Sequence, residues 1–208
     1  MKILALDLST KPGYAVLDEV GNVINLITHG TNFNLKEALN DSGLPQDFRF
    51  LKNADEVANF VKELVTRFGP DQIWAEQTNA GSFRSAQKQL EFIHCRLLQA
   101  LKELGAERKL HYVNTSDWRR TCGIRLTKEQ KLHNKAVKRK TTTGRIPKFL
   151  GKITNKHLAV MWANEKFGLK LLWKDEDAAE AACMAWCALQ SIEITNKITD
   201  KILDKALS

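Results

Sequence analysis

The sequence predicts an α/β fold, a mixed five-stranded sheet of three antiparallel strands followed by parallel strands, flanked by helices. Two observations predict it. Three short apolar runs near the N-terminus are separated by tight turns, a pattern typical of antiparallel strands. After them, segments with apolar residues at three- and four-residue spacing alternate with further short apolar runs, as in helices that connect parallel strands.

The first three strands are predicted over residues 2–8, 13–18 and 23–27, where Val, Leu, Ile and Tyr are frequent. Pro12-Gly13 provides the first turn, and residues 18–22 provide the second. These turns are too short for a crossover, so neighbouring strands run antiparallel.

The first strand ends in Asp7. An unpaired charge away from water costs on the order of several kcal/mol, so a carboxylate at the end of a buried strand needs a partner. One interpretation is that Asp7 caps the turn that contains Ser9 and Thr10. The other is that it binds a cation, and Asp7 alone does not decide between them.

A helix is predicted from Ala54 to Phe68, where apolar residues recur at helical spacing. Asn53 is expected to cap its start and Gly69-Pro70 to end it. Residues 34–53 are interpreted as a loop with a short helix.

The strand expected at residues 72–77 follows this helix, so it lies parallel to the first strand and beside it. It ends in an acidic residue, Glu76. Asp7 and Glu76 are therefore expected at the same edge of the sheet, where α/β sheets hold their ligands.

The rest of the chain continues the alternation. An amphipathic helix over 85–104 ends at Gly105, and a helix over 154–167 ends at Gly168. A strand is predicted at 110–113, and a short helix starts at Thr115. The last helix consists of small and apolar residues and is preceded by acidic residues. Residues 191–208 extend this helix or form a separate tail.

Positive charge is concentrated in one segment. Between Arg125 and Lys156 there are eleven Lys or Arg and one acidic residue, Glu129, a segment charge of +10 in a chain whose total is +8. Local positive charge favours a polyanionic partner. Because the segment has few aliphatic residues and no clear period, we expect an insertion that becomes ordered only on binding. The alternative is a solvated surface loop.

Composition excludes several classes of protein. No apolar run reaches the ~18 residues of a transmembrane helix, and the N-terminus lacks the pattern of a signal peptide. The four cysteines form no C-x-x-C pair. Cys183 and Cys187 share one face of the last helix, which favours apolar packing over zinc binding or a disulfide. We expect a cytoplasmic protein without a membrane partner.

Four acidic residues form the candidate catalytic and metal-binding set: Asp7, Glu76, Asp177 and Glu180. Asp177 and Glu180 are three residues apart and share a helix face, whereas Asp175 and Glu176 are explained by the helix dipole. An all-oxygen pocket suits Mg²⁺ or Mn²⁺, and two such ions ~3.5–4 Å apart clamp the reacting oxygens of a phosphodiester. With a basic segment that attracts DNA, this set predicts a metal-dependent nuclease.

The order of these motifs resembles a known family. D-L-S-T-K-P-G-Y-A-V-L at the first strand end, W-A-E-Q at a later strand end and D-A-A-E-A in the last helix are similar to the RuvC-type Holliday-junction resolvases of the RNase H-like superfamily. S-D-W-R-R-T-C-G and I-T-N-K-H also match comparable segments. The resemblance covers most of residues 1–190.

The resemblance implies one RNase H-like nuclease domain over residues 1–190, with a basic insertion at about 125–152. It implies a structure-selective endonuclease that cuts branched DNA, above all Holliday junctions, with two Mg²⁺ ions for which Mn²⁺ substitutes. The family acts as homodimers and builds the dimer contact on the helix at 85–104, whose apolar stripe core packing explains equally well. Bacterial members usually have Asp at the position of Glu180, and the extra methylene can reposition an ion. The insertion is longer than expected for a bacterial member, which indicates a divergent phage or viral member.

Residue roles follow from the same resemblance. Asp7, Glu76, Asp177 and Glu180 would bind the catalytic metals, and Lys156 would lie near the scissile phosphate. Phe83 with Arg84 would stack on an unpaired base or anchor a helix, and Trp118 would lie in the core or join its neighbours at phosphate. The predicted nucleic-acid-binding residues are Phe83, Arg84, Arg119, Arg120, Lys135, Lys138, Arg139, Lys140, Arg145, Lys148, Lys152 and Lys156.

Other functions remain open from the sequence alone. One is a non-catalytic nucleic-acid-binding module of the same fold, and another is a related nuclease for other branched DNA or for RNA–DNA hybrids. An actin-like or sugar-kinase ATPase also follows its first strand with Asp, Ser or Thr, and Gly. That fold normally needs two such domains and further Gly-rich loops, which this chain of 208 residues lacks.

Overall fold

The computed structural model describes residues 1–9, 12–28, 45–77, 84–141 and 151–207. Its five strands are β1 (Lys2–Asp7), β2 (Gly13–Asp18), β3 (Val23–Thr28), β4 (Gln72–Glu76) and β5 (Leu110–Val113). They form one sheet in the order β3-β2-β1-β4-β5, with β1 at the centre. β1 and β2, and β2 and β3, are antiparallel, whereas β1 and β4, and β4 and β5, are parallel. The predicted mixed sheet is confirmed.

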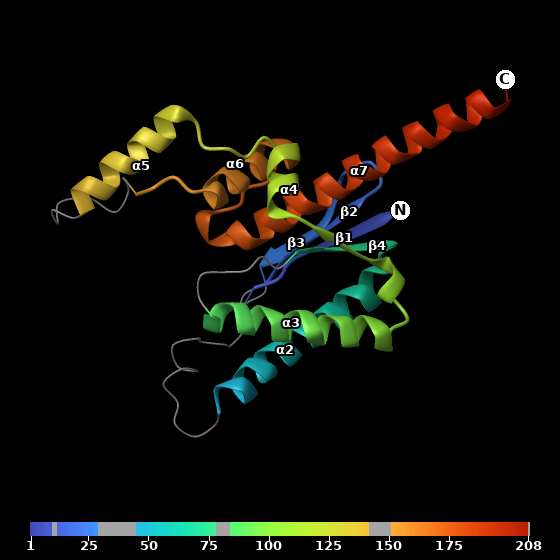
Figure 1. Cartoon of the computed structure of the whole chain (residues 1–208), viewed down its shortest axis with the longest axis horizontal. Coiled ribbons are helices and arrows are strands. Elements are labelled where there is room, and N and C mark those ends of the chain that lie inside the picture. The colour runs from blue at the N-terminus through green and yellow to red at the C-terminus, as the bar shows by residue number, and fades with distance from the viewer. Residues whose placement is uncertain (10–11, 29–44, 78–83, 142–150, 208) are drawn as a thin grey trace.

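Helices cover both faces of this sheet (Figure 1). They are α2 (Gln46–Phe68), α3 (Arg84–Glu103), α4 (Thr115–Thr121), α5 (Lys128–Thr141), α6 (Asn155–Phe167) and α7 (Glu176–Leu207), with short 3₁₀ turns η1 (Glu107–Lys109) and η3 (Trp173–Asp175). α2 and α3 form one layer, and α7 with α4 and α6 forms the other. α5 projects from the second layer, and the C-terminal part of α7 extends beyond the sheet.

The two faces of the sheet have cores of different composition. On the α2–α3 face, the core is built mainly from large residues such as Leu4, Leu6 and Leu97. On the α7 face it is rich in alanine, including Ala179 and Ala182. Small side chains let the backbone of α7 approach the sheet closely, and this face carries the candidate site.

Helix α2 begins eight residues earlier than predicted, at Gln46 after Pro45. Phe50 extends the apolar spacing of Ala54 and Val57 by one turn, and all three are fully buried. The prediction that Asn53 caps the helix was wrong, because Asn53 lies inside α2 and is 1% exposed.

Half of the basic segment is also more ordered than expected. Residues 128–141 form α5, whose start is capped reciprocally: Gln130 N–H donates to the Thr127 hydroxyl, and Thr127 N–H donates to the Gln130 side chain. Asn134 exchanges two hydrogen bonds with the backbone of Ile153, and Val137 is buried. The sequence did not predict this helix, which its cap and the Asn134 contact stabilise. That the insertion becomes ordered only on binding stays a prediction.

All four cysteines are free, and Cys122, Cys183 and Cys187 are buried. Packing is thus the role that the structure gives to Cys183 and Cys187. Among the described residues, none of the helices combines the length and the apolar character needed to cross a bilayer.

Candidate metal centre

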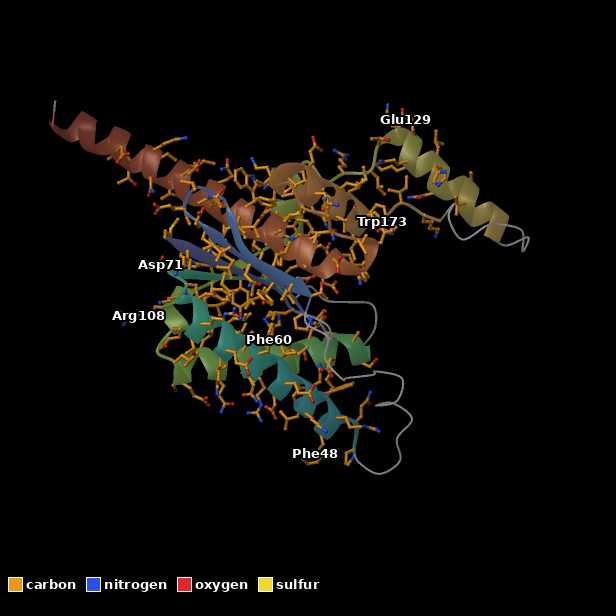
Figure 2. The ribbon with its side chains drawn as sticks, turned by 180° about the vertical axis from the view of Figure 1, so that it is seen from behind. Phe48, Phe60, Asp71, Arg108, Glu129 and Trp173 are labelled. Atoms are coloured by element: carbon orange, nitrogen blue, oxygen red, sulfur yellow. The ribbon has the colours of Figure 1, made fainter. Side chains whose placement is uncertain are left out.

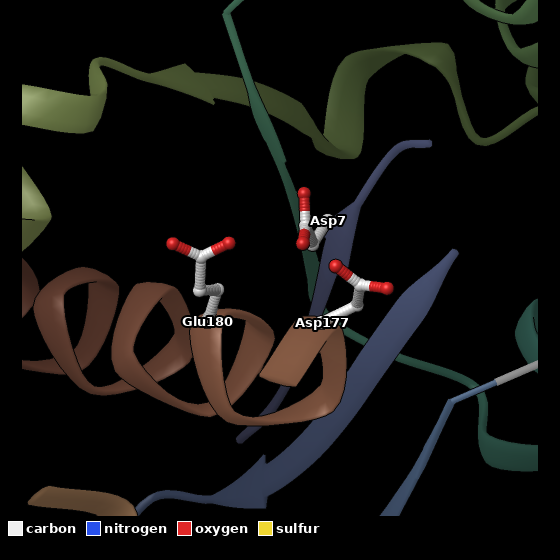
Figure 3. A group of neighbouring side chains, drawn as sticks. All are labelled: Asp7, Asp177 and Glu180. Atoms are coloured by element: carbon white, nitrogen blue, oxygen red, sulfur yellow. The ribbon is translucent and has the colours of Figure 1, made fainter. Parts of the chain in front are cut away.

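Three of the four predicted acidic residues converge at one end of the sheet. Asp7 comes from the end of β1, and Asp177 and Glu180 come from the first turns of α7. Each offers a carboxylate oxygen within 4.8 Å of the others. In Figure 3 the Asp7 side chain lies above the start of α7, and the side chains of Asp177 and Glu180 extend from α7 toward it. We call these three residues the acid cluster.

The alternation of side chains along the strands explains why Asp7 and Glu76 face α7. Successive residues of a strand point to opposite faces. Asp7 has the parity of Ile3 and Ala5, which belong to the core on the α7 face. Glu76 has the parity of Trp74, which packs against the same core. The last paired residues of β1 and β4 are Leu6 and Ala75, so both acidic residues follow at the same edge.

Gly13 brings α7 to this edge. It pairs with Asp7 across β1 and β2. A Cβ atom at position 13 would lie 2.1 Å from the carbonyl carbon of Asp177, so only glycine permits this approach. The Ala178 N–H also donates to the Thr28 hydroxyl of β3 at 3.3 Å. The start of α7 is thereby fixed against two strands.

Asp7 is buried with an incomplete set of partners. Its side chain is 7% exposed, and its Oδ2 atom has no hydrogen-bond partner. Burial raises the pKa of Asp7 well above its ordinary value, and Glu180 raises it further, while Lys156 opposes the shift. A buried carboxylate oxygen without a partner, on a residue that lies next to two other carboxylates, indicates a place for a cation.

Glu76 lies beside the acid cluster, outside the group whose oxygens come within 4.8 Å. The Thr115 hydroxyl at the start of α4 donates a hydrogen bond to Glu76 Oε1. Burial raises the pKa of Glu76 to about 7, Glu180 adds to the rise, and Arg119 and Lys156 oppose it. The negative charge of Glu180 in the acid cluster therefore acts electrostatically on Glu76.

Two basic residues contact the acid cluster. Lys156 Nζ forms ion pairs with Asp177 and with Glu180, the second at 3.2 Å. Arg119 Nη2 lies 3.3 Å from the other Glu180 oxygen. Burial acts to lower the pKa of Lys156, but Glu180, Asp177 and Asp7 together raise it above its ordinary value.

The donor set suits a hard divalent cation. The acid cluster offers carboxylate oxygens without a thiolate or an imidazole, as Mg²⁺ and Mn²⁺ prefer. Lys156 and Arg119 balance only part of the charge of the cluster together with Glu76. The residues present therefore fit a metal site of this class.

Of the other predicted nucleic-acid-binding residues whose side chains the structure describes, one contacts the acid cluster and the rest are exposed. Arg119 faces Glu180 and lies over the Trp118 ring, which is fully buried in the core. Arg120 is exposed and pairs with Asp117 at 2.7 Å. Lys135 and Lys152 are exposed. The structure describes only the backbone of four further residues, which are Arg84 at the start of α3 and Lys138, Arg139 and Lys140 in α5. Phe83, Arg145 and Lys148 lie outside the described residues.

Sequence reasoning missed the contacts of Thr115 and Arg119. Thr115 was predicted only as the start of a short helix, yet it follows β5, whose Val113 pairs with Glu76. The available signal for the contact with Glu76 was a hydroxyl residue just past the end of β5, the strand that runs parallel to β4. Arg119 was assigned to phosphate, and no spacing in the sequence indicates its contact with Glu180.

Comparison with known proteins shows the fold. No protein-family model and no curated protein sequence matches the chain. A structure of Thermus thermophilus RuvC in complex with a Holliday junction substrate matches with a TM-score of 0.60 at 13% identity, over 94% of this chain and 97% of that one. A second structure of Thermus thermophilus RuvC matches with a TM-score of 0.56 at 13% identity, over 93% and 96%. The chain therefore has the RNase H-like fold of RuvC along most of its length.

Proposed function

We propose that this protein is a RuvC-type, structure-selective endonuclease that cuts branched DNA, in particular four-way junctions, by metal-dependent phosphodiester hydrolysis. The acid cluster carries this proposal, above all the buried Asp7 oxygen without a partner. The fold shared with a protein solved on a Holliday junction supports the choice of substrate.

Asp7, Asp177 and Glu180 would hold Mg²⁺, with Glu76 completing the set that flanks it. Bound Mg²⁺ ions would neutralise charge on the scissile phosphate and lower the pKa of an attacking water. Asp7 and Glu76 sit at the ends of paired strands, so their carboxylates have little freedom to move. Thr115 orients Glu76 through its hydroxyl, and Arg119 orients Glu180.

Lys156 would act on the substrate side of the site. Its ammonium group lies among the carboxylates and its side chain is 37% exposed, so it can reach a phosphate at the mouth of the site. A lysine there holds the anionic backbone as a point charge. Helix α5, which projects from this layer in Figure 1, carries further exposed lysines such as Lys131 and Lys135.

The proposed assembly is a homodimer that would place two such sites on one junction. Support comes from the exposed side of α3 and the edge strand β5. Leu98 and Tyr112 are exposed there, at 49% and 44%. A hollow of about 460 Å³ at this place is lined by Gln77, Glu91, His94, Cys95, Leu98 and Tyr112. A second copy would cover both the hollow and the unpaired edge of β5.

Asp7→Asn tests the proposal. We expect Mg²⁺-dependent cleavage of a labelled four-way junction to fall by about four orders of magnitude, as when one member of a cooperating catalytic set is removed. Junction binding, measured by fluorescence anisotropy, stays within about threefold, because Asp7 repels rather than attracts phosphate.

Asp200→Asn is the matched control, since Asp200 is exposed far along α7 from the site. It should leave cleavage and binding at wild-type levels. Cleavage by the Asp7→Asn variant at the wild-type rate would contradict the proposal. A wild-type protein that binds junctions but cuts no branched substrate with Mg²⁺ or Mn²⁺ would instead indicate a non-catalytic binding module.

A further inference from the structure

Trp173 is an exposed aromatic residue in η3, directly before the helix that carries Asp177 and Glu180 of the acid cluster. Its side chain is 57% exposed, whereas the other four tryptophans are buried or half-buried. Its neighbour Leu172 is 60% exposed. Neither contributes to a core cluster among the described residues. Two adjacent apolar side chains presented to solvent need an explanation other than folding.

The backbone that presents Trp173 is well fixed. It belongs to η3, in which the Asp175 carboxylate accepts from Leu172 N–H and Asp175 N–H donates to Leu172 O, both at 2.9 Å. One residue earlier, Asn164 of α6 exchanges hydrogen bonds with both backbone groups of Leu171 at 2.7 and 3.0 Å. The indole is therefore exposed on a turn that is ordered before any ligand binds.

The Trp173 ring also rests on a second ring. Its centroid is 4.8 Å from that of His157, with the planes tilted by 58°. His157 is itself held by the reciprocal cap of α6, in which Thr154 N–H donates to His157 Nδ1 and His157 N–H donates to the Thr154 hydroxyl. Contact with His157 limits the rotation of the indole and leaves much of its surface free.

Both rings are chain neighbours of groups in the candidate site. His157 follows Lys156, whose ammonium group contacts the acid cluster. Trp173 precedes Asp177 by four residues, about one turn. Figure 2 places Trp173 at the end of the molecule where α7 begins, on the side from which α5 projects.

The charge around Trp173 favours an anionic ligand. Lys170 and Lys174 are exposed on either side of it. The nearest acidic residues are engaged: Asp175 with the Leu172 N–H, and Glu176 with Lys156 at 3.6 Å. A flat aromatic surface with exposed basic residues close to it in the chain suits a nucleotide, which has a π-face and a phosphate.

We propose that Trp173 is a stacking platform for a nucleobase that is unpaired or displaced next to the scissile phosphate. This inference rests on the proposed action on branched DNA and adds a residue that reads the unpaired state. Stacking accepts any base, so the platform selects structure rather than sequence. A branch point that frees a base is thereby favoured over continuous duplex.

The test uses DNA with 2-aminopurine at an unpaired position beside a branch, and the same sequence fully paired. Binding is measured with the full-length Asp7→Asn protein, so that no cleavage occurs. The parent should quench 2-aminopurine in the branched DNA. Adding Trp173→Ala should abolish the quenching and weaken binding of the branched DNA by about 5- to 100-fold, the usual effect of losing one stacked base. Binding of paired duplex should stay unchanged, and Trp173→Phe should restore most of the quenching.

Phe48→Ala is the matched control, because Phe48 is 62% exposed and lies in the α2–α3 layer, away from Trp173 in Figure 2. It should change neither quenching nor affinity. Unaltered quenching in Trp173→Ala overturns the platform, and so does an equal loss of affinity for branched and paired DNA. Loss of self-association in that variant, with DNA binding intact, would assign the patch to a protein contact and also overturn it.

The two proposals fail separately. Quenching and affinity are measured without catalysis, so they test stacking even if no substrate is cut. Conversely, normal junction cleavage with unaltered quenching in Trp173→Ala would remove the platform and leave the nuclease in place.

Discussion

The two helical layers of this protein pack against one sheet by different means. On the α2–α3 side, large residues such as Leu64 and Leu97 fill the space between helices and strands. On the α7 side, consecutive alanines and Gly13 bring backbone against backbone. The acid cluster, Lys156 and α5 all belong to the second side.

This difference shows how the fold positions its acidic residues. The Asp177 side chain is short, so it reaches Asp7 only if the helix axis lies close to the sheet. Close packing by small residues provides that approach, whereas a layer of leucines would hold the helix further away. We therefore expect stability and geometry to be separable, with the α2–α3 layer contributing the first and the α7 layer determining the second.

The largest effect on geometry is expected from Gly13→Ala. The added Cβ would meet the backbone of Asp177 at 2.1 Å, and backbone cannot move aside as a flexible side chain does. Overpacking of this kind costs about 1–3 kcal/mol. A displacement of about 1 Å lowers catalysis on the order of 100-fold. Junction cleavage per folded molecule, with the folded fraction taken from circular dichroism, measures this effect.

Leu97→Ala is the counterpart in the other layer. Leu97 is fully buried in α3, so its truncation should lower the free energy of unfolding by about 2–5 kcal/mol. Urea denaturation measures that loss. Cleavage per folded molecule should remain at the wild-type level at a temperature where the variant is folded. Equal losses of cleavage in the Gly13 and Leu97 variants would show that the layers do not divide the two tasks.

The pKa of Glu76 predicts a pH dependence that originates on the α7 side. The unfolded chain ionises Glu76 near its ordinary pKa of 4.5, whereas the folded, metal-free protein retains the proton until about pH 7. The folded state binds more protons between these values, so the free energy of unfolding falls as pH rises from about 4.5 to about 7. The change is about 3 kcal/mol, and Glu76→Gln should remove that share in urea titrations with a chelator.

Glu63→Gln gives the control in the α2–α3 layer, because Glu63 is exposed on α2. It should leave the pH dependence as in the wild type. Mg²⁺ should also flatten the wild-type curve, since a bound cation stabilises the ionised carboxylates. A wild-type curve that rises between pH 4.5 and 7 in chelator would contradict the assignment to Glu76.

The smallest effect is expected from α5. Replacing Lys135, Lys138 and Lys140 by Gln should weaken junction binding modestly and reduce the slope of log K against log salt by about one for each lost phosphate contact. Anisotropy titrations between 50 and 200 mM salt, roughly, measure that slope. Cleavage at saturating DNA should be unchanged, because helix α5 projects from the layer that holds the acid cluster.

The matched control replaces Lys52, Lys102 and Arg108, which are exposed in or beside the α2–α3 layer. The same number of charges is removed there. An equal reduction of the salt slope in both variants would mean that binding follows net charge rather than the α5 surface.

Much of this fold was predictable because strand ends and helix faces follow short-range rules. Apolar runs bounded by turn residues predicted the strands that end in Asp7 and Glu76, and i,i+3 spacing placed Asp177 and Glu180 on one helix face. Their roles in catalysis remain predictions. α5 was not predicted, since it lacks a continuous apolar stripe, although its Thr127 to Gln130 cap was readable.

Contacts between distant segments were less predictable. Nothing local to Thr115 or Arg119 indicates a carboxylate from another element as its partner. Such pairs depend on how α4 lies against the sheet and α7, which is a property of packing. Trp173 was missed for a related reason, because only the folded surface shows that it is exposed beside the site.

Lys156 gives the acid cluster a counterion that belongs to the chain itself. Because α6 tethers it, its local concentration near the carboxylates does not fall on dilution, dialysis or chelation. Any divalent ion that binds must therefore compete with the Lys156 ammonium group for the carboxylates of Asp177 and Glu180. A metal affinity measured for this protein reports the difference between two cations, and not the strength of the oxygen ligands alone.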